Sequence, residues 1–322
     1  MTTSEVSVDA SGHKLVECVP NFSEGRRPDV MQALVNAILT APVHVIDTHA
    51  DADHNRMVVT FVGEPEAVLE AAFSGAQAAS VLINLEEHSG VHPRIGATDV
   101  IPFIPLRNVS YDECIVLARR LGQRIADELT IPVYLYEKAA VRPERVDLAN
   151  VRKWGYEWLK TAIQSEAEYE PDFGNRVLTG AGATAVGVRS PLIAFNVYLD
   201  TADVETAKAI ARGIRASNGG LPAVKAIGVL VGGKAQVSIN LTDYRVTSLY
   251  TLMNAVRSIA QQLGVDVSNS ELVGLVPQSA LIDYAIASLG LPQTAREQVL
   301  EKRLGAATSD YREPDFGSKM FE

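Results

Sequence analysis

The histidines of this 322-residue sequence are concentrated near its beginning, because all six precede residue 93. His88 and His92 lie four positions apart, and Pro93 fixes the backbone after His92. Histidine has an unperturbed pKa of about 6.5, which suits a general acid or base at neutral pH. The spacing alone favours a structural histidine at position 92, and at position 88 a charge that stabilises a helix C-terminus. A proton-transfer role for His92 is the alternative.

The stretch DTHADADHNR (47–56) gathers carboxylates and histidines of the kind that bind metals. A calcium loop beginning at Asp51 is excluded, because Arg56 stands where that loop needs glycine and Val62 where it needs glutamate. A histidine–carboxylate site for zinc or another transition metal stays open. The other interpretations are a solvated acidic turn between two strands and a loop that faces a substrate.

One glycine pattern, GVLVGGKA (228–235), resembles a phosphate-binding loop. Ala235 replaces the serine or threonine that would hold Mg²⁺ in such a loop. A strand-like alternation follows where a helix N-terminus should receive the phosphate. The pattern therefore predicts a hairpin turn.

A second pattern, VLTGAGATA (177–185), fits a dinucleotide fingerprint through Gly180 and Gly182. Gly187 and Pro191 interrupt the helix that should follow it. The stretch instead predicts a glycine loop whose backbone N–H groups approach a ligand, because glycine permits close approach.

The composition excludes several classes of protein. A net charge of −10 without any run of basic residues argues against a nucleic-acid partner. No apolar run approaches the roughly 18 residues of a transmembrane helix, and the polar N-terminus has no signal core, so we expect a cytoplasmic protein with no membrane partner. Cys18 and Cys114 lie in apolar segments and are expected to be buried rather than bonded.

Hydrophobic periodicity predicts the same order of elements in each half of the chain. In the first half we expect strands at 14–22, 43–49, 56–63 and 98–105 and helices at 27–40 and 65–83. In the second half we expect strands at 191–200, 224–231, 235–243 and 270–277 and helices at 203–217 and 246–264. Prolines in 98–105 predict an edge strand or a distorted end. The repeat predicts an α+β protein with two ferredoxin-like (β-α-β-β-α-β) subdomains and a ligand groove between them.

An extension is expected between the two repeats. It comprises a helix at 110–129, a strand at 131–138, a helix at 148–164 and a glycine-rich junction at 171–191. We therefore expect an N-terminal subdomain at 1–189, a C-terminal subdomain at 190–305 and a polar tail at 306–322.

Long motifs of unusual composition run through most of the chain. They are LVECVPNFSEG (15–25), NR (55–56) followed by TFVGEPEAV (60–68), HPRIGATDVIPFIP (92–105), PVYLYEKAA (132–140), PDFG (171–174), GAT (182–184), LIAFNVYL (192–199) and ELVGLVP (271–277). With these motifs the sequence resembles the formiminotransferase family, the glutamate formimidoyltransferases of histidine degradation. The resemblance runs from residue 15 to about residue 290.

The resemblance implies a fold of two α/β subdomains with a folate groove between them. It implies that His92 is the catalytic acid–base group, that tetrahydrofolate is the co-substrate, and that no metal is needed. It also implies folate contacts from the glycine-rich junction and from Gly219 or Gly220. The residues assigned to folate are Gly174, Arg176, Leu178, Thr179, Gly180, Gly182 and Gly220.

The sequence departs from the family pattern in three places. His49 stands where mammalian members carry a second acid, two residues after Asp47. The loop after PDFG is about one residue shorter than in the family. The length of the chain leaves no room for a cyclodeaminase domain, so a separate cyclodeaminase is expected to act on the product.

The implied reaction moves the formimino group of N-formimino-L-glutamate to N5 of tetrahydrofolate. Arg56 and Arg94 are candidates to bind substrate carboxylates, because guanidinium pairs with carboxylate bidentately, although each has a structural ion pair as its alternative. We expect Asp47 to orient His92 or the substrate amine and Asn55 to bind substrate. Two rival functions are formyl transfer involving N-formylglutamate or 5-formyltetrahydrofolate, and folate binding without turnover. The family suggests a homodimer.

Overall fold

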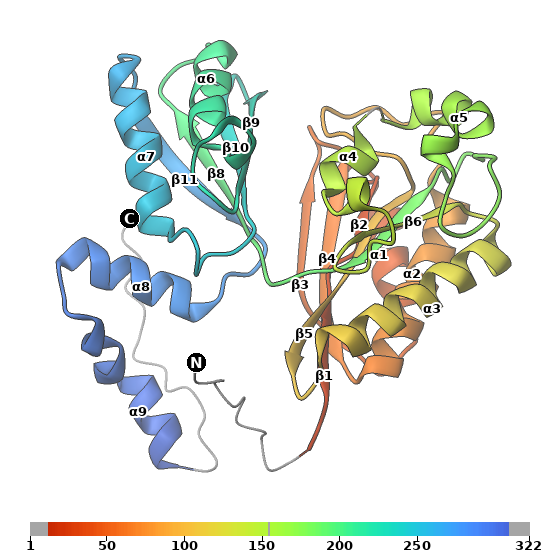
Figure 1. Ribbon diagram of the computed structural model, residues 1–322, viewed down its shortest axis with the longest axis horizontal. Coiled ribbons are helices and arrows are strands. Elements are labelled where there is room, and N and C mark those ends of the chain that lie inside the picture. The colour runs from red at the N-terminus through yellow and green to blue at the C-terminus, as the bar shows by residue number, and fades with distance from the viewer. Residues whose placement is uncertain (1–11, 154, 309–322) are drawn as a thin grey trace. The chain divides into compact units, whose positions relative to one another are not determined.

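The structure is a computed structural model that describes residues 12–153 and 155–308 (Figure 1). The chain divides into two compact units, Met1–Pro191 and Leu192–Glu322. Both units are mixtures of helices and strands, and each is built around a sheet of its own. The α+β class predicted from the sequence is therefore confirmed. Within the described residues, no helix is long and apolar enough to cross a membrane.

The sheet of the first unit runs in the order β3-β4-(β1, β2)-β5-β7-β6, because β1 and β2 each pair with both β4 and β5. The pairs from β3 to β5 are antiparallel, and β7 is parallel to β5 and β6. The strands are β1 (Leu15–Cys18), β2 (Asn21–Phe22), β3 (His44–Asp51), β4 (Arg56–Gly63), β5 (Thr98–Arg107), β6 (Val133–Glu137) and β7 (Thr184–Val188). The helices are α1 (Pro28–Ile38), α2 (Pro65–Leu82), α3 (Tyr111–Leu129), α4 (Leu148–Arg152) and α5 (Gly155–Ser165), with short 3₁₀ turns η1 (Pro143–Arg145) and η2 (Ala167–Tyr169).

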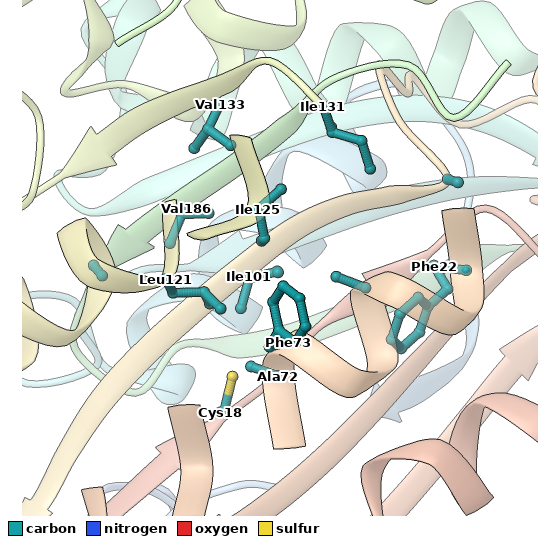
Figure 2. Packing of buried hydrophobic residues seen from close by; sticks show 14 of the residues in the cluster. Cys18, Phe22, Ala72, Phe73, Ile101, Leu121, Ile125, Ile131, Val133 and Val186 are labelled. Carbon is teal, nitrogen blue, oxygen red and sulfur yellow. The ribbon is translucent and has the colours of Figure 1, made fainter. Parts of the chain in front are cut away.

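The main core of the first unit lies between one face of this sheet and helices α1, α2 and α3. Figure 2 shows Leu121 and Ile125 of α3 and Phe73 of α2 facing Ile101 of β5 and Val186 of β7. Burial of such side chains supplies roughly 1.5–3 kcal/mol each. The apolar spacing that predicted the three helices is therefore the pattern that fixes their orientation on the sheet.

Both cysteines lie in this core as predicted: they are free and buried, and Figure 2 shows Cys18 beside Ala72. Burial raises the pKa of the Cys114 thiol to about 11, and the pKa of Cys18 is also well above its ordinary value. Neither thiol is therefore prepared to act as a nucleophile.

The opposite face of the sheet carries a smaller apolar cluster. Val100, Tyr136 and Ala185 alternate along their strands with residues of the main core, so they point to the other side. Leu148 and Val151 of α4 pack on this second cluster. Helix α4 is consequently placed against the face that the three long helices leave open.

Three expectations for the first unit were wrong in part. Strand β5 is internal rather than at an edge. Its prolines are accommodated at two places. At the break between β1 and β2 the Pro102 carbonyl accepts a hydrogen bond from the Val19 N–H (3.4 Å), and at the start of β1 the register shifts next to Pro105. Strand β7, assigned to the junction, is fully buried and so shows no alternation in sequence. The helix expected at 148–164 is two helices, separated near Gly155, whose φ is +73°.

The sheet of the second unit has the order β11-β8-β10-β9, with all neighbours antiparallel. Its elements are β8 (Ile193–Leu199), α6 (Val204–Ile214), η3 (Ala216–Asn218), β9 (Val224–Val231), β10 (Lys234–Leu241), α7 (Leu249–Gln262), β11 (Val267–Val273), α8 (Gln278–Leu289), η4 (Gln293–Gln298) and α9 (Leu300–Ala307). Helices α6 and α7 contribute to a separate core with the strands. The predicted tail begins inside α9, and residues 309–322 of it lie outside the described residues.

The glycine pattern at 228–235 is the hairpin turn predicted from the sequence. Val231 of β9 pairs with Lys234 of β10, and the two glycines between them have φ values of +55° and +76°. Two successive residues with positive φ make the turn type that joins antiparallel strands most tightly. A phosphate-binding loop is thereby excluded.

Candidate active site

His92 lies on the segment between α2 and β5, where its ring orientation is fixed by the neighbouring backbone. Its Nδ1 atom lies 2.8 Å from the Pro93 carbonyl oxygen. A carbonyl oxygen only accepts hydrogen bonds, so Nδ1 carries the proton in the neutral ring and Nε2 presents a lone pair. The His54 ring lies beside it, with the ring centres 5.8 Å apart. His92 therefore has the tautomer of a general base that acts through Nε2.

Burial and two neighbouring cations keep the His92 ring neutral. Burial is the larger cause, and the guanidinium groups of Arg56 and Arg152 add to it, so the pKa of His92 lies well below its ordinary value. Asp99 and the Pro93 carbonyl oppose this shift without cancelling it. The neutral base is thus the resting form at pH 7, and the imidazolium formed by proton transfer is a stronger acid than ordinary histidine.

The two cations are held by one buried carboxylate. Asp99 Oδ2 lies 2.7 Å from Arg56 Nη1 and 2.9 Å from Arg152 Nη1, while Asp99 Oδ1 accepts the Ile95 N–H at 2.8 Å. Burial alone would raise the pKa of Asp99, but the two arginines and the N–H donor lower it to about 2. Arg56 also donates to Asn21 Oδ1 through Nε (3.1 Å) and Nη2 (2.8 Å). Asp99 is therefore an ionised anchor for both guanidinium groups.

The strand register explains why Arg56 lies on this face. Met57 and Val59 of β4 are part of the main core, so Arg56 and Thr60 point to the opposite side of the sheet. The pairing of β3 with β4 shifts by one residue between Val45 and Asp47. This shift exchanges the faces of the sheet to which the following side chains of β3 point. As a result Asp47 is paired with Thr60 and shares the face of Arg56.

Asp47 retains an unsatisfied atom on that face. Its Oδ2 is buried and has no hydrogen-bond partner among the described residues, and the same holds for His54 Nε2. Buried polar atoms without partners are uncommon in proteins, and a bound ligand can supply the missing hydrogen bond. The predicted role of Asp47 toward His92 or a substrate amine stays a prediction.

Arg94 is held by partners within the protein. Its guanidinium forms a bidentate pair with Glu157, at 3.0 and 2.6 Å, and its Nε donates to His88 Nδ1 at 3.0 Å. His88 Nε2 donates to the Asn55 carbonyl at 3.0 Å, so both ring nitrogens are occupied. Burial lowers the pKa of His88, and the ring is neutral and structural. The structural ion pair that the sequence left open for Arg94 is the arrangement observed.

Asn55 forms a clamp between loops. Its Oδ1 accepts the Gly25 N–H at 2.9 Å, and its Nδ2 donates to the Ser89 carbonyl at 3.0 Å. The first bond holds the β3–β4 turn against the loop between β2 and α1, and the second holds it against the segment that carries His92. The contacts describe a structural residue, and substrate binding by Asn55 stays a prediction.

The glycine-rich stretch packs against the segment that carries His92. Gly182 has a φ of +72°, and a Cβ at this position would lie 2.2 Å from the Ile95 carbonyl. The Ala183 N–H donates to that carbonyl at 2.9 Å, and the Ala97 N–H donates to the Ala181 carbonyl at 2.8 Å. The Gly180 carbonyl accepts the Leu85 N–H at 2.8 Å. The glycines thus permit close packing of two chain segments.

The backbone N–H groups of residues 181–183 are consequently occupied within the protein. Two of them bond to Thr179, the Gly182 N–H to its carbonyl at 2.9 Å and the Ala181 N–H to its Oγ1 at 3.3 Å. The sequence predicted that such groups approach a ligand, and for these three the structure contradicts it. Folate contacts through other atoms of the stretch stay predictions.

The remaining residues assigned to folate have structural surroundings of their own. Arg176 donates to the carbonyls of Ile163 (2.6 Å) and Glu166 (2.7 Å) at the end of α5, and Leu178 belongs to the main core. Gly174 is exposed in a turn with φ +91°.

Gly220 lies in the second unit, where its N–H donates to the Arg215 carbonyl at 3.1 Å beside the end of α6. None of these contacts tests folate binding.

Comparison with known proteins gives the chain its family. A model of the formiminotransferase domain, N-terminal subdomain, matches residues 15–189, and a model of the formiminotransferase domain matches residues 194–299. The chain belongs to the formiminotransferase family. Within that family it is similar to a glutamate formimidoyltransferase from Thermoplasma acidophilum, with 46% identity over 92% of this chain and 99% of that protein.

Two further relatives in the formiminotransferase family differ in length. A glutamate formimidoyltransferase from Streptococcus pyogenes is 43% identical over 90% of this chain and 99% of its own length. A formimidoyltransferase-cyclodeaminase from Rattus norvegicus is 47% identical over 84% of this chain, which spans 52% of that relative.

The described residues contain no group of three or more His, Cys, Asp or Glu side chains placed to hold a metal ion. Each unit has a hollow on its surface. One of about 260 Å³ lies between α8 and η4 in the second unit, and one of about 610 Å³ lies along α3 beside Phe173.

Sequence reasoning missed Asp99 and Arg152. Asp99 had a usable signal, because a carboxylate inside the apolar strand 98–105 requires a buried partner. Arg152 had none, since an arginine on a short helix is usually exposed and only the fold brings it to Asp99.

Proposed function

We propose that this member of the formiminotransferase family is a glutamate formimidoyltransferase that moves the formimino group of N-formimino-L-glutamate to N5 of tetrahydrofolate, with His92 as the acid–base residue. The two full-length relatives carry that activity in their names. The observation that carries the role of His92 is its Nδ1–carbonyl bond, which leaves Nε2 as the base.

The reaction needs one proton to move between two nitrogens. N5 of tetrahydrofolate attacks the formimino carbon, and Nε2 of His92 takes the proton that N5 loses as the new N–C bond forms. The imidazolium then gives this proton to the glutamate nitrogen as the C–N bond to glutamate breaks. General acid–base catalysis of this kind contributes roughly 10²- to 10⁴-fold in rate. Arg56 and Arg152 favour the second step, because they make the imidazolium more acidic.

Tetrahydrofolate is a co-substrate in this proposal. We assign to it the stretch from Gly174 to Gly182 and also Gly220. Because the N–H groups of 181–183 are occupied within the protein, other atoms of the stretch must make the contacts.

We further propose that both subdomains, at 1–189 and 190–305, are ferredoxin-like. The order β11-β8-β10-β9 supports this for the second, and β3-β4-β1-β5 supports it for the first. The groove, the homodimer, the cytoplasmic location and the need for a separate cyclodeaminase stay predictions.

A spectroscopic turnover assay tests the proposal. Wild type, His92→Ala and His44→Ala would be compared with tetrahydrofolate and either N-formimino-L-glutamate or N-formyl-L-glutamate. His44 is the control, because it is exposed at the start of β3. We expect formimino-dependent turnover that falls by at least about 100-fold in His92→Ala and is retained in His44→Ala. Turnover with the formyl donor alone would move the assignment to formyl transfer, and folate binding without turnover would leave a binding protein.

A further inference from the structure

The groups beside His92 carry more positive charge than the protein neutralises. Arg56 and Arg152 share the single carboxylate of Asp99, which leaves one positive charge over. Among the described residues, neither arginine forms an ion pair with any other carboxylate. Burial of an uncompensated cation is costly, and a bound anion relieves that cost. The excess charge therefore points to an anionic ligand at this place.

The donors available for such an anion belong to Arg152. Arg56 donates to Asn21 and Asp99 from all three of its guanidinium nitrogens. The fork of Arg94 is filled by Glu157, as described above. Arg152 bonds to Asp99 through Nη1, its Nε is buried with no partner among the described residues, and 16% of its side chain is exposed.

We propose that Arg152 binds the α-carboxylate of the amino-acid substrate. The proposal rests on the proposed function. The formimino group is attached to the α-nitrogen, so the α-carboxylate lies within two bonds of the atom that His92 must protonate. The γ-carboxylate is two methylene groups further away. An arginine close enough to act on His92 through its charge is thus placed for the nearer of the two carboxylates.

Three substrates separate the two carboxylates. N-formimino-L-glutamate would be compared with its α-carboxamide and its γ-carboxamide, each with wild type, Arg152→Gln and Arg152→Lys. In Arg152→Gln we expect KM for N-formimino-L-glutamate to rise about 10- to 100-fold and the KM for tetrahydrofolate to change little. The value of kcat should fall by a smaller factor with every donor, because the His92 imidazolium becomes less acidic. With the α-carboxamide, which has already lost the charge that Arg152 would bind, the same substitution should change KM little. With the γ-carboxamide it should raise KM as much as with N-formimino-L-glutamate. Arg152→Lys should recover part of the loss, since it keeps the charge without the fork.

Two measurements separate binding from a merely structural role. Arg152→Gln removes a positive charge next to His92, so the acid limb of kcat/KM should move to higher pH. Arg145→Gln is the matched control, because Arg145 is also buried and paired, and its partner is Asp172 (2.7 Å) rather than Asp99. It should lower stability without any preference among the three substrates.

The assignment would be overturned if Arg152→Gln raised KM equally for N-formimino-L-glutamate and its α-carboxamide. It would also be overturned if the rise in KM disappeared with the γ-carboxamide, because Arg152 would then bind the γ-carboxylate. Absence of formimino transfer in the wild type would instead overturn the proposed function.

Discussion

Removal of the Asp99 charge tests whether the buried network is the anchor of the site. Asp99→Asn keeps the shape of the side chain and one hydrogen-bond acceptor but removes the charge that Arg56 and Arg152 share. Lowering the pKa of Asp99 from 3.8 to about 2 corresponds to about 2 kcal/mol of stability. Two buried guanidinium groups would then lack a counter-charge, and breaking a buried pair costs about 3–5 kcal/mol. We therefore expect a loss of about 3–5 kcal/mol at pH 7.

Urea unfolding at a series of pH values measures this quantity. Because the folded-state pKa lies below the unfolded one, the Asp99 contribution is complete above about pH 4 and disappears as the pH falls through about 2. The gap between wild type and Asp99→Asn should accordingly narrow toward acid. Asp172→Asn, which breaks the buried pair with Arg145, is the control for loss of any such pair. A stability loss below about 1 kcal/mol at pH 7, or a gap that does not depend on pH, would refute the reasoning.

Two further predictions concern the segment that carries His92. In the wild type the acid limb of kcat/KM should lie below pH 6.5, because burial and the two cations keep His92 neutral, and in Asp99→Asn it should move lower still; a limb above pH 7 in a pH–rate profile would contradict this assignment. Gly182→Ala should destabilise the protein by about 2 kcal/mol or more and reduce kcat, because the φ of Gly182 is +72° and a Cβ would lie 2.2 Å from the Ile95 carbonyl. The control is Gly232→Ala in an open turn, which should leave kcat unchanged. Thermal unfolding and turnover assays of the two glycine variants measure these effects. An unchanged melting temperature in Gly182→Ala would contradict the prediction, because it would show that the segment accommodates a Cβ without strain.

Most elements of the fold follow from hydrophobic periodicity, and the exceptions have physical causes. Strand β4 occupies the residues predicted for it, since its pattern combines β-branched residues with a clear boundary at each end. Strand β7 was missed because a strand buried on both faces has no alternation to detect. For the strand at 98–105 the prolines left an edge position and a distorted end open. Strand β5 is internal, and its pairing with β1 is irregular near both prolines, which depends on a different part of the sequence.

The site likewise combines features that follow from the sequence with features that depend on the fold. The family resemblance supplied His92, and the bond from Nδ1 to the Pro93 carbonyl gives that residue a physical reason to act through Nε2. The resemblance supplied no partners for the arginines, and chemistry alone could not choose among them, because any guanidinium suits a carboxylate. The choice depends on which donors the fold has already used, and this is a tertiary property.

In the proposed mechanism, the network also helps His92 to serve as base and acid in turn. A histidine with an ordinary pKa would be partly protonated at neutral pH and would part with its proton less readily. Arg56 and Arg152 destabilise the imidazolium, while Asp99 holds both cations in place and limits the effect. A substrate carboxylate that binds Arg152 would partly neutralise this charge and raise the pKa of His92 in the complex. We therefore expect the acid limb of kcat, which reports the complex, to lie at higher pH than that of kcat/KM, which reports the free enzyme. Coincident limbs would mean that no substrate charge reaches Arg152.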